Sequence, residues 1–228
     1  MALILSLETS TDICSVALHR DGTLINEIIV DQPQAHASRL APLIRDLVTQ
    51  SSSRVSDLSA VAISSGPGSY TGLRIGTSTA KGICFTLEIP LIAVGTLEVM
   101  AARAVNQVHE KEAFLCPMID ARRMEVYCQL FNTKLEPVSG MEAKIIDESS
   151  FQELLNTHKM FFFGNGAAKC RSMLNSDNAR YLDGIQPHAS QLGALAGVKF
   201  VNRDFQDVSA FEPQYLKQFE VKKAKSIF

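Results

Sequence analysis

The most informative segment is Ser64-Ser65-Gly66-Pro67-Gly68-Ser69-Tyr70-Thr71-Gly72-Leu73-Arg74-Ile75-Gly76. It joins a predicted buried strand to a predicted helix through a glycine-rich turn. Glycine in a helix interior costs about 1 kcal/mol relative to alanine, so Gly76 and the later Gly82 need a reason to be there. Gly72, Gly76 and Ala80 recur every four residues. They therefore line one face of the helix, on which another helix can pack closely.

Two interpretations of this loop stay open from the residues alone. One is a tight turn that packs inside the protein, and the other is a phosphate cradle, since backbone N–H groups at a helix start attract anions. The order G-x-x-x-x-G-K-[ST] is absent, which excludes a nucleotide P-loop of that kind. The hydroxyls of Thr9, Ser10 and Thr11, which follow Glu8, also have two interpretations: they form hydrogen bonds within a hairpin turn, or they bind phosphate.

Outward from the loop, strands and helices alternate in two halves of similar size. Apolar runs predict strands, and apolar spacings of three and four predict helices. The predicted strands are 3–7, 13–19, 24–30, 58–64, 90–94, 113–119, 124–131 and 160–163, and the predicted helices are 35–48, 71–87, 96–107, 151–155 and 187–200. This order predicts an α/β protein of two related lobes, 1–108 and 109–228, divided at a charged segment. The sequence leaves open whether the last helix packs back on the first lobe.

Composition excludes several classes of protein. The 228 residues carry 22 Lys plus Arg against 24 Asp plus Glu, so no global positive field draws the chain to nucleic acid or to a membrane. Any such binding must be local or go through a partner. The apolar start at 1–7 is short and lacks a basic leader, which favours a buried strand over a signal peptide. No apolar run approaches about 20 residues, so we expect a cytoplasmic protein without membrane contact.

The residues that bind metals or act as nucleophiles show no suitable spacing. The 5 cysteines include no C-x-x-C pair and are scattered through apolar segments, a pattern typical of reduced core thiols. The 5 histidines include no pair at helical metal spacing. We therefore expect neither a metal site nor a catalytic residue in this chain.

Four segments together carry a resemblance to a known family. Glu8-Thr9-Ser10-Thr11, the loop 66–76, Ile119-Asp120-Ala121-Arg122 and Pro213-Gln214-Tyr215-Leu216 occur in an order and spacing that resembles the TsaB family, also called YeaZ. The resemblance covers nearly the whole chain. It implies a two-lobed actin/hexokinase-like (ASKHA, ribonuclease H-like) fold. It also implies a contribution to N6-threonylcarbamoyladenosine synthesis beside the anticodon of tRNA, next to the family's catalytic relative, TsaD.

The resemblance also implies that this chain is not the catalyst. Where the transferase has two metal-binding histidines spaced by four, this sequence has Thr96 and Met100, and neither a hydroxyl nor a thioether replaces imidazole there. Glu8 stands where we expect an aspartate that approaches a nucleotide-bound metal. We therefore predict no cofactor, and ATP or ADP binding is left open.

The partners follow from the same resemblance. They are a TsaD-like transferase, a TsaE-like ATPase, a second copy of the chain when the transferase is absent, and tRNA indirectly through the complex. The resemblance assigns the partner interface to the first lobe, and we place it on the helices 35–48 and 71–87. The predicted interface residues are Leu40, Leu43, Leu47, Gly72, Leu73, Gly76, Thr77 and Ala80.

Three further motifs each have two interpretations. Asp120, Arg122 and Arg123 in a hairpin turn suit a surface ion pair or a partner contact. The turn 164–166 joins a strand to a helix or faces adenine, and the lysines at 217, 222, 223 and 225 are a solvated end or touch tRNA. The rival functions are a stand-alone metal-dependent glycopeptidase, a sugar-kinase-like ATPase of the same fold, and a nucleotide sensor.

Overall fold

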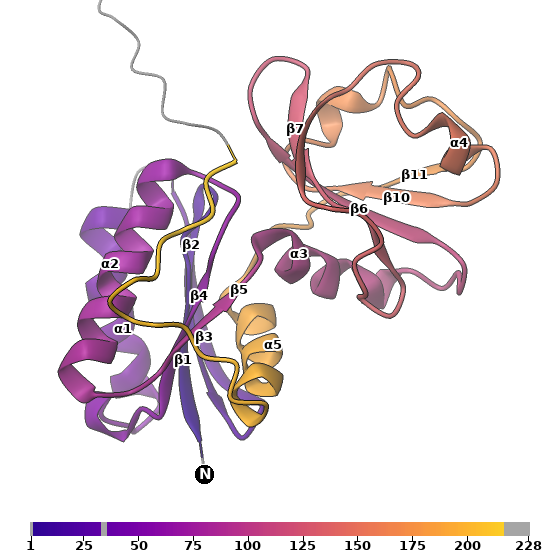
Figure 1. The fold of residues 1–228 in the computed structure, drawn as a ribbon. Helices are drawn as coiled ribbons and strands as arrows, with labels where there is room; N and C mark the ends of the chain where they lie inside the picture. The colour runs from indigo at the N-terminus through magenta and orange to yellow at the C-terminus, as the bar shows by residue number, and fades with distance from the viewer. Residues whose placement is uncertain (1, 33–35, 217–228) are drawn as a thin grey trace, which may run out of the picture.

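Two β-sheets, each with its own core, divide the protein into two lobes (Figure 1). The computed structural model describes residues 2–32 and 36–216. The first sheet has five strands in the order β3-β2-β1-β4-β5, and the second has the order β11-β10-β6-β7-β9, with β8 paired to β6. The predicted two-lobed α/β architecture is confirmed.

The first sheet carries the ribonuclease H-like strand order. Its strands are β1 (Leu3–Glu8), β2 (Ile13–Arg20), β3 (Thr23–Asp31), β4 (Ala60–Ser64) and β5 (Leu91–Val94). The pairs β1–β2 and β2–β3 are antiparallel, which two short hairpin turns allow. The pairs β1–β4 and β4–β5 are parallel. β1 is the middle strand and is buried along its whole length, and its carboxyl end lies beside that of the parallel strand β4.

Helices cover both faces of the first sheet. α1 (His36–Gln50) and α2 (Tyr70–Leu87) lie on one face, and α5 (Ala189–Val201) lies on the other (Figure 1). Successive β1 residues alternate between these layers, since side chains of a strand point to opposite faces. Leu5 belongs to the core under α1, whereas Ile4 belongs to the core under α5. The last long helix therefore returns to the first lobe.

The second lobe is built on a shorter sheet. Its strands are β6 (Phe114–Asp120), β7 (Glu125–Cys128), β8 (Phe131–Asn132), β9 (Glu142–Ile145), β10 (Met160–Phe163) and β11 (Ala179–Leu182). Its short helix is α4 (Gln152–Leu155), and a 3-10 turn lies at Ala168–Cys170. α3 (Thr96–Ala104) and the 3-10 turn Val105–Gln107 lead into this lobe, and a further 3-10 turn, Val55–Asp57, belongs to the first lobe. α3 packs on β6 and on α5, so it lies between the lobes.

The segment 202–216, which we call the C-terminal strap, runs from α5 back along the first lobe (Figure 1). The Lys81 ammonium donates to two strap carbonyls, at 3.0 and 3.1 Å. Near its end, Gln214 N donates to Ser65 O at 2.7 Å, which ties the strap to the glycine loop. The lysine-rich tail of the sequence analysis lies outside the described residues. No helix among the described residues is long and apolar enough to cross a bilayer.

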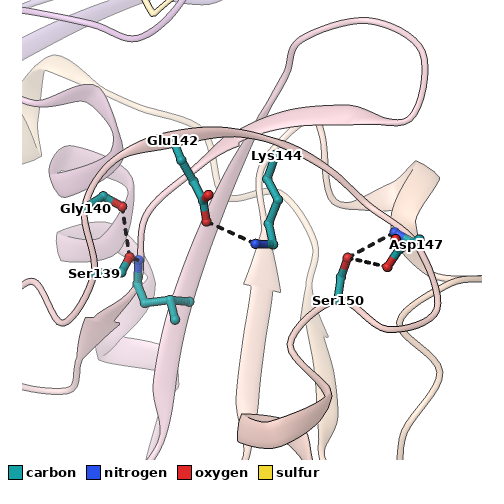
Figure 2. A network of polar contacts seen from close by, with 7 residues as sticks. Ser139, Gly140, Glu142, Lys144, Asp147 and Ser150 are labelled. Atoms are coloured by element: carbon teal, nitrogen blue, oxygen red, sulfur yellow. Dashed lines mark hydrogen bonds and ion pairs between the residues drawn. The ribbon is translucent and has the colours of Figure 1, made fainter.

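Local polar contacts lie in and just after β9, at the edge of the second sheet. Lys144 Nζ pairs with Glu142 Oε1 at 3.2 Å, and the Asp147 carboxylate accepts from the Ser150 hydroxyl at 2.9 Å (Figure 2). Hydrogen bonds from the Ser149 and Ser150 side chains lower the pKa of Asp147. All these partners lie within three residues of one another. The network therefore stabilises a local turn.

Candidate functional site

The turn after β1 is buried, and its acid is fully engaged within the lobe. Glu8 Oε1 accepts from Ser10 N at 2.8 Å and from Ser10 Oγ at 2.5 Å, and Glu8 Oε2 accepts from Ser64 Oγ. Burial raises the pKa of Glu8, although the hydrogen bonds from Ser10 and Ser64 act in the opposite direction. The carboxyl group thus links β1 to β4 and is closed to solvent.

The glycine loop lies directly on this turn. Ser69 N donates to Ser10 O at 2.7 Å. A Cβ added to Gly68 would lie 2.2 Å from Ser10 O, and one added to Gly72 would lie 2.1 Å from Thr9 O. Only glycine permits such close contacts between backbones. Tight packing inside the lobe therefore explains these glycines.

The eight residues predicted to contact a partner lie inside the first lobe, which corrects that assignment. Each is buried between α1 or α2 and the structure beneath them. They are Leu40, Leu43, Leu47, Gly72, Leu73, Gly76, Thr77 and Ala80. A Cβ on Gly76 would lie 2.3 Å from Thr9 Oγ1, so the small-residue ridge packs on the chain's own turn and not on another molecule.

The opposite side of α2 is exposed. We call it the outer face of α2, and its exposed residues follow one another at helical spacing: Thr71, Arg74, Ser78, Gly82 and Phe85. The Phe85 ring is 82% exposed, and a Cβ on Gly82 would meet no atom within 4 Å. Sequence reasoning grouped Gly82 with Gly76. Because the two are six residues apart, at about 100° per residue they lie on different sides of the helix, and this signal was missed.

The two positions that the resemblance sets against metal-binding histidines lie on α3, which packs on β6 and on α5. Thr96 and Met100 are fully buried on α3. Met100 packs against Gly164 of the second lobe: a Cβ added to Gly164 would lie 2.4 Å from the Met100 methyl group. Within residues 2–32 and 36–216, no group of three or more histidine, cysteine, aspartate or glutamate side chains is placed to hold a metal ion.

All five cysteines are free and buried. Burial raises the pKa of Cys14 and of Cys84 to about 11. Burial also raises the pKa of Cys116, which lies beside Cys128 and Cys170 in the second lobe. Because only the thiolate is a good nucleophile, these thiols are poorly reactive at neutral pH.

Two adjoining pockets share one partly buried acid, Glu98. The smaller, about 350 Å³, lies between the lobes, and the larger, about 610 Å³, lies beside the C-terminal strap; Gly95, Glu98 and Gln214 line both. Burial raises the pKa of Glu98, while Lys199 and the backbone of Gly95 act in the opposite direction. The bond to Gly95 is typical of an acid in the first turn of a helix, so Glu98 has a structural role at the start of α3.

The hairpin between β6 and β7 is the exposed polar site of the second lobe. Asp120 N donates to Asn165 Oδ1 at 2.9 Å, and Lys169 Nζ donates both to the Asp120 carboxylate and, at 2.7 Å, to Glu125 O. Asp120 therefore forms a surface ion pair, but its cation is Lys169, and the pair predicted with Arg122 or Arg123 does not form among the described residues. The turn 164–166 supports this hairpin from the side, because Gly166 allows close contact with the backbone of Asp120.

Comparison with known proteins agrees with this geometry. The family model of tRNA N6-adenosine threonylcarbamoyltransferase, TsaD, matches residues 24–225. The tRNA threonylcarbamoyladenosine biosynthesis protein TsaB of Haemophilus influenzae is 31% identical over 226 residues, 94% of this chain and 93% of that protein. The TsaB proteins of Escherichia coli and Bacillus subtilis are 40% and 37% identical over 54% and 58% of this chain. These two alignments span only about half of the relatives' length, 52% and 56%.

Solved structures give the same result. The structure of YeaZ from Pseudomonas aeruginosa superposes with a TM-score of 0.83 at 28% identity, covering 95% of this chain and all of that one. A second Pseudomonas aeruginosa structure, described as similar to the peptidase YeaZ, gives a TM-score of 0.84 at 28% identity, with 95% of this chain and 100% of that chain covered.

The two sheets, the α3 junction and the closed first turn define a two-lobed α/β protein of the actin-like (ASKHA) class. The chain belongs to the TsaB family, also called YeaZ, of tRNA threonylcarbamoyladenosine biosynthesis proteins.

Proposed function

We propose that this chain is a non-catalytic subunit required for threonylcarbamoyl transfer to the adenosine next to the anticodon of tRNA, and that it works in the cytoplasm. It binds a TsaD-like transferase and holds it active, and it reaches tRNA through that complex. The outer face of α2, with Gly82 and the exposed Phe85 ring, is the observation that carries the proposal.

Gly82 is the informative residue of this face. An exposed glycine in a helix interior costs about 1 kcal/mol relative to alanine, and the described chain offers no atom near the place of its missing side chain. A partner element that approaches the backbone closely supplies the reason that the isolated lobe lacks. The Phe85 ring, 82% exposed one helical turn away, offers such a partner a large apolar anchor.

A transferase of the same fold is the occupant we assign to this face. The family model that matches the chain is that of the transferase, so the two partners present homologous first lobes to each other. Similar surfaces also allow a second copy of the chain to bind when the transferase is absent. A TsaE-like ATPase then acts on the assembled pair.

We further propose that no nucleotide binds at the turn of Glu8 and Thr9. The glycine loop occupies the space above that turn, and the Glu8 carboxyl group already accepts from Ser10 and Ser64. The same reasoning speaks against a sugar-kinase-like ATPase. The buried Thr96 and Met100 speak against a metal-dependent glycopeptidase, so neither rival is favoured.

The test is reconstituted tRNA modification combined with a variant of the outer face. Incorporation of labelled threonine into tRNA is measured with ATP and bicarbonate while each component is omitted in turn. Omission of this chain should abolish incorporation, and the chain alone should give none. Gly82→Leu should weaken co-elution with the transferase at least tenfold and lower the modification rate in parallel, because the added side chain holds the two surfaces apart.

The matched control is Gly140→Leu, since a Cβ at Gly140 also meets no atom within 4 Å but lies in the second lobe. It should leave complex formation unchanged. Circular dichroism and a thermal melt verify that both variants fold. Full modification without this chain would contradict the proposed role, and normal co-elution of Gly82→Leu would contradict the assigned face.

A further inference from the structure

The tip of the β6–β7 hairpin has an unusual backbone for its residues. Arg122 and Arg123 are consecutive and both adopt left-handed conformations, with φ of 72° and 48°. Residues with a Cβ disfavour this region, which glycine and, to a lesser degree, asparagine enter more readily. Two arginines are therefore a poor choice for the turn itself. Strained, exposed residues of this kind point to a role outside the fold.

The rest of the hairpin is held firmly, so the tip is presented in one orientation. Ala121 N donates to Glu125 O and Glu125 N donates to Arg122 O, both at 3.1 Å. Arg122 N donates to the Asp120 carboxylate at 2.8 Å. The Lys169 ammonium bridges Asp120 and Glu125 O from the side. These contacts fix the backbone from which both arginine side chains extend.

The two guanidinium groups are exposed and unpaired within the described part of the chain. Neither Arg122 nor Arg123 donates a side-chain hydrogen bond or forms an ion pair to a described residue, although Asp120 attracts Arg122 through space. The Asp120 carboxylate is bound by Lys169, so the nearest acid is already engaged. Two adjacent guanidinium forks on a rigid turn match the geometry of phosphate oxygens, which they bind in pairs of hydrogen bonds.

The location of the hairpin suits a polynucleotide. It follows the carboxyl end of β6, beside the parallel strand β10, and ligands of α/β sheets commonly bind beyond the carboxyl ends of parallel strands. It belongs to the second lobe, whereas the outer face of α2 belongs to the first lobe (Figure 1). The whole chain has a net charge of -2, so contact with an anionic polymer must be local.

We propose that Arg122 and Arg123, here called the arginine tip, bind phosphate groups of the tRNA backbone when the chain is assembled with its transferase. The inference rests on the proposed function and extends it, since it gives this subunit a direct RNA contact. Phosphate contacts position an RNA without reading its sequence. The arginine tip therefore orients the tRNA while chemistry takes place in the partner.

Two variants separate the RNA contact from the turn. Arg122→Asn with Arg123→Gly places residues that tolerate a left-handed backbone at both positions, and should raise stability while it removes both cations. Arg122→Gln with Arg123→Gln removes the same charges and keeps the strain. The matched control is Lys134→Gln with Arg180→Gln, which removes two exposed cations elsewhere in the second lobe.

The affinity of each assembled complex for unmodified tRNA is measured by fluorescence anisotropy over a series of salt concentrations. Both arginine variants should bind roughly tenfold more weakly at low salt, and the slope of log affinity against log salt should fall by about one to two. The control should keep the wild-type affinity and slope. Modification at limiting tRNA should fall with the affinity, while saturating tRNA should restore it.

Assembly with the transferase is measured first by size-exclusion chromatography. Failure of the wild-type chain to assemble would refute the proposed function, and this inference with it. Unchanged tRNA affinity in assembled complexes of both variants would overturn the arginine tip alone. Loss of assembly in the arginine variants, but not in the control, would show that the tip contacts an acidic protein surface, and would also overturn the RNA contact.

Discussion

The first strand of each sheet ends in an acid and a tight hairpin turn, yet the two turns have opposite surroundings. Glu8 ends β1 and is fully buried under the glycine loop. Asp120 ends β6, and its side chain is 48% exposed beside Lys169. Burial raises the pKa of Glu8. For Asp120 burial acts in the same direction, but the hydrogen bonds from Lys169 and from the backbone of Arg122 outweigh it and lower the pKa.

Equivalent positions in the two sheets therefore do not give equivalent sites. The segment that packs on each turn determines whether the turn is accessible for binding. In the first lobe, the glycine loop packs directly on the turn, and Ser69 N donates a hydrogen bond to Ser10 O. In the second lobe, the turn 164–166 supports the hairpin from the side and leaves its tip open. One turn has become part of the core, and the other remains available for binding.

The largest expected effect comes from breaking the cover of the first turn. Gly76→Leu should destabilise the folded chain by about 3 kcal/mol or more, because its Cβ would overlap the Thr9 hydroxyl and the added atoms have no space between α2 and β1. Denaturant unfolding measures the loss. Gly82→Leu on the outer face of the same helix is the control, and it should change stability by less than about 1 kcal/mol. Equal stability of the two variants would contradict the buried ridge.

Most elements of the fold were predictable from the sequence, because apolar runs and helical spacing are long and regular in the first lobe. The strand prediction at 160–163 matches β10, and that at 58–64 lies within two residues of β4. The strands β9 and β11 were missed. Each has only four residues and is half exposed, so neither shows an apolar run or a clear alternation. The strand predicted over 124–131 is divided into β7 and β8, because residues 129 and 130 between them do not pair with β6.

The candidate site was harder to predict, because its contacts join residues far apart in the chain. Nothing in the local sequence shows that Thr9 lies against Gly76, or that Lys169 reaches Asp120. Glycine recurrence indicated a close approach correctly but gave no sign of the partner, which proved to be the chain's own turn. The left-handed backbone at Arg122 was hidden for the opposite reason, since no glycine or asparagine marks the turn.

The second effect concerns the buried acid and depends on pH. Because the pKa of Glu8 is higher in the folded chain than its ordinary value of 4.5, the folded state loses stability as pH rises through the folded pKa. Below pH 4.5 both states are protonated and this loss is absent. Glu8→Gln removes the titration and keeps a donor and an acceptor for Ser10 and Ser64. Relative to the unmodified chain, the variant should therefore gain stability as the pH rises from 4 to 8.

Unfolding free energies of both proteins are measured in urea at several pH values, and their difference isolates residue 8 from all other titrating groups. Glu148→Gln serves as the control, because Glu148 is an exposed glutamate of the second lobe. A difference that stays flat with pH, or that favours the unmodified chain at high pH, would show that the hydrogen bonds from Ser10 and Ser64 outweigh burial.

The smallest expected effect comes from the exposed acid, Asp120, and has the opposite sign in pH. The pKa of Asp120 is lowered in the folded chain, so its stabilising contribution is present above the ordinary value of 3.8 and is lost as pH falls. Because the side chain is 48% exposed, solvent and salt screen its pair with Lys169, and Asp120→Asn should cost only about 0.5–1 kcal/mol at pH 7. The cost should shrink at 1 M salt and vanish near pH 2. Asp177→Asn, an exposed aspartate without a side-chain hydrogen bond to a described residue, should cost nothing at either pH. A loss at Asp120 as large as that at Gly76 would mean that the open turn is as tightly integrated as the covered one, and the contrast between the two lobes would fail.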